Sequence, residues 1–178
     1  MDRSNPFALL YNIEVRARAR VRGLPRRSEG KPTWSGIVFR LGDQELAAPL
    51  LEVNEVLAFP AVSRVPGTKP WVRGLANVRG NLLPVMDLRT LLEGTPVVRG
   101  RKNRVLVIKH KELFAGLLVD EVIGLRHFLQ EESTPQPPVA ETSLAPYLQG
   151  GFERNGRYTP VFGLYALAES TAFMQVAT

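Results

Sequence analysis

Asn77 and Arg79 are the polar residues that stand out in an otherwise apolar segment, where they offer an amide and a guanidinium group. Residues two apart in an extended segment point to the same face, so these two side chains share one face. The same spacing separates Val53 from Glu55, and Glu55 can pair with Arg79 at a groove if the two segments lie close together. Two interpretations stay open: an ordinary surface salt bridge, worth about 0 to 1 kcal/mol, or a binding surface.

The sequence contains no recognisable catalytic or metal-binding pattern. His110 and His127 have no second histidine, cysteine or carboxylate at the spacing of metal ligands. A Gly-x-Ser-x-Gly elbow and a Walker-type phosphate loop are both missing from the sequence. Three aspartates have structural explanations at a turn, a helix N-cap and a strand start, namely Asp43, Asp87 and Asp120. The sequence therefore predicts no cofactor and no metal, and it does not support an enzyme.

The basic character of the chain is concentrated near its start. Residues 1–30 carry seven arginines and three acidic residues, a net charge of +4, so the other 148 residues carry only +2 of the total of +6. This distribution argues against a nucleic-acid-binding barrel, which requires a basic barrel face. The absence of cysteine excludes disulfides. No apolar run approaches the length of a membrane span, so we expect a cytoplasmic protein without direct membrane insertion.

Residues 1–33 are predicted to form a basic extension, with an amphipathic helix between Asn5 and Gly23 followed by a linker. Apolar residues recur there at steps of three and four, which gives one apolar stripe. Three interpretations stay open for this helix: docking on the body of the protein, recognition of a partner, or binding to a membrane or nucleic acid.

From Trp34 the apolar period becomes that of β-strands. Hairpins are predicted around Gly42-Asp43, His110-Lys111, Gly80-Asn81 and Asn155-Gly156, and the chain from Leu51 to Val56 is predicted to continue extended. A short helix is expected after Asp87 and a terminal helix over residues 164–175. Short paired strands without a strand-helix-strand rhythm predict an all-β fold of barrels.

The same small β unit occurs twice in the sequence, once over 70–91 and again over 146–167. Matching positions of the two segments have the same or similar residue types in one constant register, and internal repetition of this kind indicates a duplicated structural unit. The loop over residues 94–103 is the predicted boundary between the halves. The matches are Pro70, Trp71, Val72, Gly74, Pro84, Val85, Met86, Leu88 and Leu91 with Pro146, Tyr147, Leu148, Gly150, Pro160, Val161, Phe162, Leu164 and Leu167.

The chain from Trp34 to about Ser170 resembles the CheW family of chemotaxis coupling proteins. Three stretches carry the resemblance: WSGIVFRLGDQELAAPLLEVNEVL, VSRVPGTKPWVRGLANVRGNLLPVMDL and LFAGLLVDEVIGL. The basic extension, the PWVRG phrase and the proline-rich loop are most similar to the branch of the family that serves type IV pilus signalling. The resemblance implies two five-stranded SH3-like barrels related by a pseudo-twofold axis with a shared core, at about 34–100 and 101–170, with strands exchanged between them in some arrangements and a tail over 171–178.

The resemblance also implies a non-catalytic scaffold of a two-component pathway. Such a scaffold links the cytoplasmic tip of a methyl-accepting chemoreceptor, in membrane-bound receptor arrays, to the regulatory domain of a CheA-like histidine kinase. A type IV pilus pathway controlling twitching motility is expected, and flagellar chemotaxis is the alternative. The kinase is expected on the second barrel, at residues that the resemblance does not assign. The receptor-binding groove of the family maps onto Val53, Glu55, Gly74, Asn77 and Arg79.

One position departs from the family pattern. Gly163 stands where family members often carry an acidic or amide residue, and where the first half has Asp87. We therefore expect the second junction between strand and helix to lack a side-chain cap. Glycine in place of aspartate at an N-cap costs only a few tenths of a kcal/mol.

Overall fold

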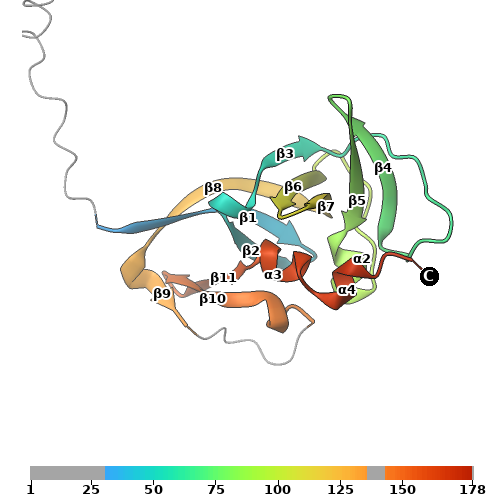
Figure 1. The fold of residues 1–178 in the computed structure, drawn as a ribbon. Helices are drawn as coiled ribbons and strands as arrows, with labels where there is room; N and C mark the ends of the chain where they lie inside the picture. Colours follow the sequence, from blue (N-terminus) through green and yellow to red (C-terminus); the bar gives the residue numbers. More distant parts are fainter. Residues whose placement is uncertain (1–30, 136–142, 178) are drawn as a thin grey trace, which may run out of the picture. The chain divides into compact units, whose positions relative to one another are not determined.

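The computed structural model describes residues 31–135 and 143–177, and the chain from Pro32 onward forms one compact unit. Two β-sheets lie side by side, with α3 and α4 close to the region between them (Figure 1). This arrangement confirms the predicted all-β fold. The predicted amphipathic helix between Asn5 and Gly23 lies outside the described residues.

Each sheet combines strands from both halves of the sequence, so strands are exchanged between the sheets. The six-stranded sheet has the order β8-β1-β2-β11-β10-β9, with β1 Thr33–Leu41, β2 Gln44–Pro49, β8 Glu121–Leu129, β9 Ser133–Thr134, β10 Leu148–Arg154 and β11 Arg157–Phe162. The five-stranded sheet has the order β3-β6-β7-β5-β4, with β3 Glu55–Ala58, β4 Val72–Val78, β5 Asn81–Asp87, β6 Arg104–His110 and β7 Leu113–Val119. The helices are α2 Leu88–Glu93, α3 Leu164–Ala168 and α4 Thr171–Met174, and the 3-10 turns are η1 Leu50–Glu52, η2 Gln130–Glu132 and η3 Ala145–Tyr147.

The predicted repeat of the two segments 70–91 and 146–167 is visible in the backbone hydrogen bonds. The backbone N–H of Asp87 donates to the carbonyl of Trp71 at 2.7 Å, and that of Gly163 donates to the carbonyl of Tyr147 at 2.8 Å. Each bond closes a β-hairpin at the point where its second strand turns into a short helix. The two hairpins are therefore built on one backbone plan.

Each hairpin of the repeat also contacts an additional segment, and the two contacts occur at equivalent positions. Ser63 bridges Leu75 in the first half, and Thr134 pairs with Gly151 in the second. The first contact is an isolated bridge, whereas the second has a neighbouring pair and is long enough to count as the two-residue strand β9. This difference explains why one sheet has the five strands predicted and the other has six.

Apolar side chains form one core shared by the two sheets and a smaller core within each. The shared core includes Phe39 and Leu46 from the six-stranded sheet, Leu106 and Leu117 from the five-stranded sheet, and side chains of α2, α3 and α4. The smaller cores belong to the five-stranded sheet, around Leu83 and Val105, and to the six-stranded sheet, around Val38 and Phe128. Burial of the shared core holds the sheets together.

The terminal helix is shorter than predicted. The single helix expected over residues 164–175 is divided into α3 and α4. Ser170 adopts an extended conformation between them, and its Oγ accepts a hydrogen bond from the backbone N–H of Phe173 at 3.2 Å. A serine N-cap of this kind competes with continuation of the helix, which accounts for the break.

Candidate functional site

Glu55 and Arg79 form the ion pair that their spacing predicts. Arg79 Nη2 lies 2.5 Å from Glu55 Oε1, and Arg79 Nη1 lies 3.4 Å from Glu55 Oε2. The pair joins β3, at one edge of the five-stranded sheet, to the turn that follows β4, which is the strand at the other edge. Because 76% of the Arg79 side chain is exposed, the pair contributes little to stability. The pair orients the Arg79 guanidinium toward Glu55 while most of the side chain remains accessible to a partner.

The turn that carries Arg79 differs by one residue from the prediction. Val78 pairs with Asn81, so the two turn residues are Arg79 and Gly80 rather than Gly80 and Asn81. Both turn residues have left-handed backbone conformations, with φ of 51° and 84°. Asn77 is exposed on β4, and its Oδ1 accepts a hydrogen bond from the backbone N–H of Gly80 at 2.9 Å. Asn77 thus stabilises the turn on which Arg79 sits, instead of sharing a strand face with it.

Val53 follows a turn that the prediction of a continuous strand missed. The 3-10 turn η1 occupies Leu50–Glu52, and the extended chain begins at Val53, whose backbone N–H donates to the carbonyl of Leu50 at 3.2 Å. From there the predicted alternation holds, because Val53 and Glu55 are partly buried while Asn54 is exposed. The Val53 side chain packs against the shared core, so it anchors the segment that carries Glu55.

Gly74 has a structural role that its sequence position did not reveal. It lies at a bulge in β4 with φ of +134°, a conformation that favours glycine. A Cβ atom there would overlap the backbone of Ser63, which bridges Leu75. Gly74 therefore allows the loop after β3 to close against β4, on the strand that leads to Asn77 and Arg79.

Three apolar residues near Val53 were not singled out in the sequence. Leu51 is 92% exposed, and Leu50 and Val56 are each 37% exposed. They flank the start of β3, the strand that carries Glu55. The only sequence signal was the pair of leucines directly after Pro49, and such a pair can equally be buried. Neighbouring exposed apolar residues of this kind often mark an interaction surface.

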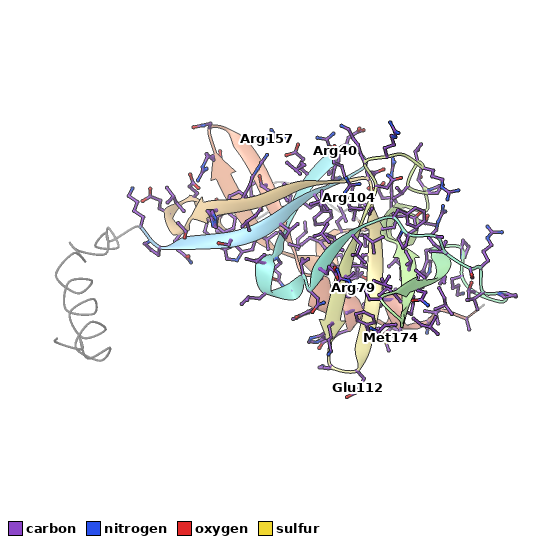
Figure 2. The ribbon with its side chains drawn as sticks, turned by 90° about the horizontal axis from the view of Figure 1, so that it is seen from above. Arg40, Arg79, Arg104, Glu112, Arg157 and Met174 are labelled. Carbon is purple, nitrogen blue, oxygen red and sulfur yellow. The ribbon has the colours of Figure 1, made fainter. Side chains whose placement is uncertain are left out.

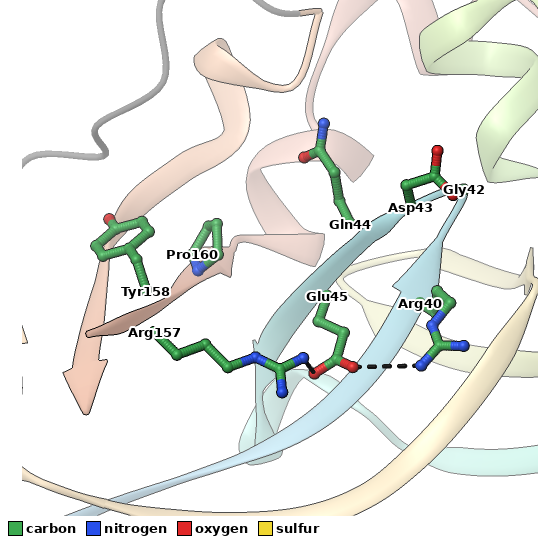
Figure 3. A pocket seen from close by; sticks show the side chains of 8 residues that line it. All are labelled: Arg40, Gly42, Asp43, Gln44, Glu45, Arg157, Tyr158 and Pro160. Atoms are coloured by element: carbon green, nitrogen blue, oxygen red, sulfur yellow. Dashed lines mark hydrogen bonds and ion pairs between the residues drawn. The ribbon is translucent and has the colours of Figure 1, made fainter. Parts of the chain in front are cut away.

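A second group of arginines lies on the six-stranded sheet, around Glu45 (Figure 3). Arg157 Nη2 lies 2.7 Å from Glu45 Oε2, and Arg40 Nη2 lies 3.3 Å from Glu45 Oε1. Figure 2 labels these two arginines near one another, with Arg79 apart from them. The hollow that they line has a volume of about 600 Å³. Because the arginines share a carboxylate of the protein itself, they have less positive charge to offer to nucleic acid.

The histidines take part in hydrogen bonds that link different elements. His110 Nε2 lies 2.8 Å from Glu169 Oε1, and the His110 ring stacks on Tyr165 with 4.1 Å between ring centroids. His127 Nδ1 lies 2.7 Å from Ser35 Oγ. Among the described residues no group of three or more histidine, cysteine or acidic side chains is arranged to hold a metal ion.

Comparisons with known proteins agree with this architecture. The family model described as CheW-like domain matches residues 35–172. The chain is 46% identical over 177 residues to Protein PilI of Pseudomonas aeruginosa, which covers 99% of this chain and 98% of PilI. It is 30% identical over 129 residues to Protein FrzA of Myxococcus xanthus, covering 72% of this chain and 80% of FrzA.

The fold is also similar to a solved structure, the scaffolding protein TtCheW from Thermoanaerobacter tengcongensis. The TM-score is 0.68 at 22% sequence identity, and the match covers 79% of this chain and 96% of TtCheW. In the part of the chain that the structure describes, every helix is too short or too polar to cross a bilayer. The family match over residues 35–172 and the identity to PilI show that this chain belongs to the CheW-like family.

Proposed function

We propose that this protein is a non-catalytic adaptor that couples a methyl-accepting chemoreceptor to a CheA-like histidine kinase and controls twitching by type IV pili. The observation that carries the proposal is the 46% identity to PilI over 99% of the chain. This alignment extends beyond the CheW-like domain, which begins at residue 35, into the basic extension. The pilus pathway is therefore preferred to flagellar chemotaxis.

The receptor tip binds, in this proposal, beside the Glu55–Arg79 pair. Leu50, Leu51 and Val56 supply exposed apolar area next to that pair. A helix that docks on such a surface gains affinity from apolar anchors, and polar residues at the rim fix its orientation. Arg79 is suited to the second task because it is exposed and already oriented by Glu55.

Arg79 has a left-handed backbone conformation in the turn between β4 and β5. Asn155 occupies the equivalent position in the second hairpin of the repeat, with φ of 52° against 51° for Arg79. Asparagine is favoured in the left-handed conformation, whereas a long side chain such as arginine is uncommon there. Strained backbone of this kind occurs often at ligand-binding sites. A binding role for Arg79 agrees with this conformation, but Lys111 in the turn between β6 and β7, with φ of 54°, shows that a long side chain also occupies it in an ordinary hairpin.

The kinase is proposed to bind the second half of the CheW-like domain through contacts between sheets, at receptor arrays on the membrane. Calorimetric titration of the full-length protein with the isolated regulatory domain of each CheA-like kinase of the same organism tests this step. Binding to one kinase identifies the pathway, and binding to none contradicts the coupling function. Deletion of the gene is expected to abolish twitching and to leave swimming intact. Loss of swimming with intact twitching would instead assign the protein to the flagellar pathway.

The substitution Arg79→Glu tests the receptor surface. It places two carboxylates together at positions 55 and 79, so it removes the oriented guanidinium and reverses its charge. We expect binding to a receptor cytoplasmic fragment to weaken about tenfold or more, which corresponds to about 1.4 kcal/mol or more. Binding to the kinase domain is expected to remain unchanged.

Arg154→Glu is the matched control. Arg154 forms a similar pair on the six-stranded sheet, with Nε 2.6 Å from Glu132 Oε1. Circular dichroism and the urea midpoint establish that both variants fold. If folded Arg79→Glu bound the receptor fragment as the wild type does, the surface assigned to the receptor would be wrong.

A further inference from the structure

A second pocket lies at one end of the five-stranded sheet, away from the Glu55–Arg79 pair. It has a volume of about 300 Å³ and is enclosed by the loop after β3, the start of β4 and the chain that follows α2. Its apolar wall includes Phe59 and Val62, which pack against the inner core of this sheet. Its polar wall consists of three arginines, Arg64, Arg73 and Arg99.

The positive charge of this pocket is mostly uncompensated. Arg73 Nη1 lies 3.7 Å from Asp87 Oδ2, but the Asp87 carboxylate is fully buried and already accepts hydrogen bonds from the backbone N–H groups of Thr90 and Val97. Arg64 and Arg99 form no ion pair with any residue that the structure describes. None of the residues that line the pocket is acidic. Like charges gathered in a partly enclosed site repel one another, so an anion there is stabilising.

The guanidinium group of Arg99 is held in position by an aromatic ring. It lies over Phe59 at 5.9 Å from the ring centroid, within the range of a cation–π interaction. Because Phe59 is packed on the core, this contact orients Arg99 before any ligand arrives. The cluster around Glu45 provides a contrast, since Arg40 and Arg157 there are satisfied by an internal carboxylate (Figure 3).

We propose that the pocket lined by Arg64, Arg73 and Arg99 binds an oxyanion, either a phosphate or a carboxylate group. Planar guanidinium groups bind both through paired N–H donors. The volume of about 300 Å³ lies at the lower end of the range of small-molecule pockets, which suits a small anionic group. The anion belongs either to a free small molecule or to the acidic side chain of a partner protein.

The full-length protein is titrated with inorganic phosphate and, separately, with N-acetyl-glutamate amide, and its backbone amide shifts are followed by NMR. Sodium chloride at matched ionic strength controls for charge screening. We expect saturable shifts that are concentrated at the amides of residues 59, 61–64, 72–73 and 99. Stronger saturation by phosphate assigns a phosphate ligand, and stronger saturation by the glutamate compound assigns an acidic side chain.

Two variants make the test specific. Arg64→Gln with Arg99→Gln removes the two unpaired charges and is expected to weaken binding at least about tenfold. Arg157→Gln, in the other arginine cluster, is expected to leave binding unchanged. The proposal is overturned if the shifts do not saturate, if they spread over all basic surfaces, or if the folded double variant binds as well as the wild type.

Discussion

The two strand-to-helix junctions of the repeat share a backbone but differ in the side chain that caps the helix. Asp87 has φ of −83° and ψ of 105°, and Gly163 has φ of −78° and ψ of 105°. Asp87 caps α2 with its own carboxylate, whose Oδ1 accepts a hydrogen bond from the N–H of Thr90 at 2.9 Å. Gly163 has no side chain to do the same for α3.

Glu52 provides the missing cap from the other half of the sequence. Its Oε2 accepts hydrogen bonds from the backbone N–H groups of Leu164 at 2.6 Å and Tyr165 at 3.1 Å. The expectation that Gly163 supplies no cap is confirmed, but the expectation that the junction lacks a side-chain cap is wrong. The cap at the first junction comes from Asp87 itself, whereas the cap at the second junction comes from Glu52 and joins the two halves of the chain. The same backbone conformation can thus be kept while the side chains that accept hydrogen bonds from the first N–H groups of the helix come from different parts of the chain.

The largest expected effect concerns the bulge glycines that precede the two junctions. Gly74 and Gly150 both have positive φ, and a Cβ on Gly150 would lie 2.9 Å from the Thr134 carbonyl oxygen, whereas one on Gly74 would approach the Ser63 carbonyl oxygen still more closely. We expect Gly74→Ala to lower the free energy of unfolding by about 2 to 4 kcal/mol, and Gly150→Ala by less. Urea unfolding measures both, and equal losses would show that the two bulges are equally tight.

Asp87→Ala breaks the local cap at the first junction. It removes the acceptor for the N–H groups of Thr90 and Val97 and leaves Arg73 without its carboxylate partner. We expect a loss of about 2 to 3 kcal/mol in the free energy of unfolding, because a helix cap and a buried acceptor are lost together. The exposed turn variant Asp43→Ala is the control, with an expected change within about 0.5 kcal/mol. A loss for Asp87→Ala no larger than that of the control would contradict the role of this cap.

Glu52→Ala breaks the cap that joins the two halves. We expect a loss of about 1 kcal/mol, smaller than for Asp87 because Glu52 is only partly buried. Hydrogen exchange is expected to increase at Leu164 and Tyr165 while α2 keeps its protection. Glu93→Ala, which removes only the surface pair with Arg89, is the control. Unchanged exchange in α3 would mean that this helix does not depend on Glu52.

The C-terminal ends of the two helices give the smallest and most specific difference. α2 ends on Gly94 with a left-handed conformation, whereas α3 ends at Glu169, whose carboxylate contacts His110 and Lys111. Hydrogen bonds from His110 and then Lys111 lower the pKa of Glu169 from 4.5 to about 2. The ionised carboxylate therefore stabilises the fold above pH 4.5, and this contribution is lost as the pH falls toward about 2.

Glu169→Gln tests this pH dependence. The urea midpoint of the variant is expected to lie below that of the wild type near neutral pH, and the difference is expected to shrink as the pH falls through the window from 4.5 to about 2. Glu153→Gln on the exposed face of β10 controls for general charge effects. A difference that stays constant with pH would show that the contacts of Glu169 do not depend on its charge.

Features that depend on near neighbours and on repetition could be predicted from the sequence. Period-2 alternation predicted the strands, the repeat of segment 70–91 at 146–167 predicted two hairpins on one plan, and an aspartate before an apolar run predicted the cap of α2. The Asn155-Gly156 turn also agrees with the structure, because both residue types favour left-handed backbone. The Glu55–Arg79 pair was predicted on the condition that the two segments lie close together, because the spacing of Asn77 and Arg79 matches that of Val53 and Glu55.

Other contacts between groups that are distant in the sequence could not be predicted, because they depend on how the strands are arranged in space. Local preference favoured Gly80-Asn81 as the turn, but the register of β4 with β5 places Arg79 in the left-handed position. Glu52 caps α3, and Leu51 is exposed although it is apolar. Local rules describe residues that are close in sequence, whereas burial and long-range hydrogen bonds depend on how the exchanged strands bring the two halves together.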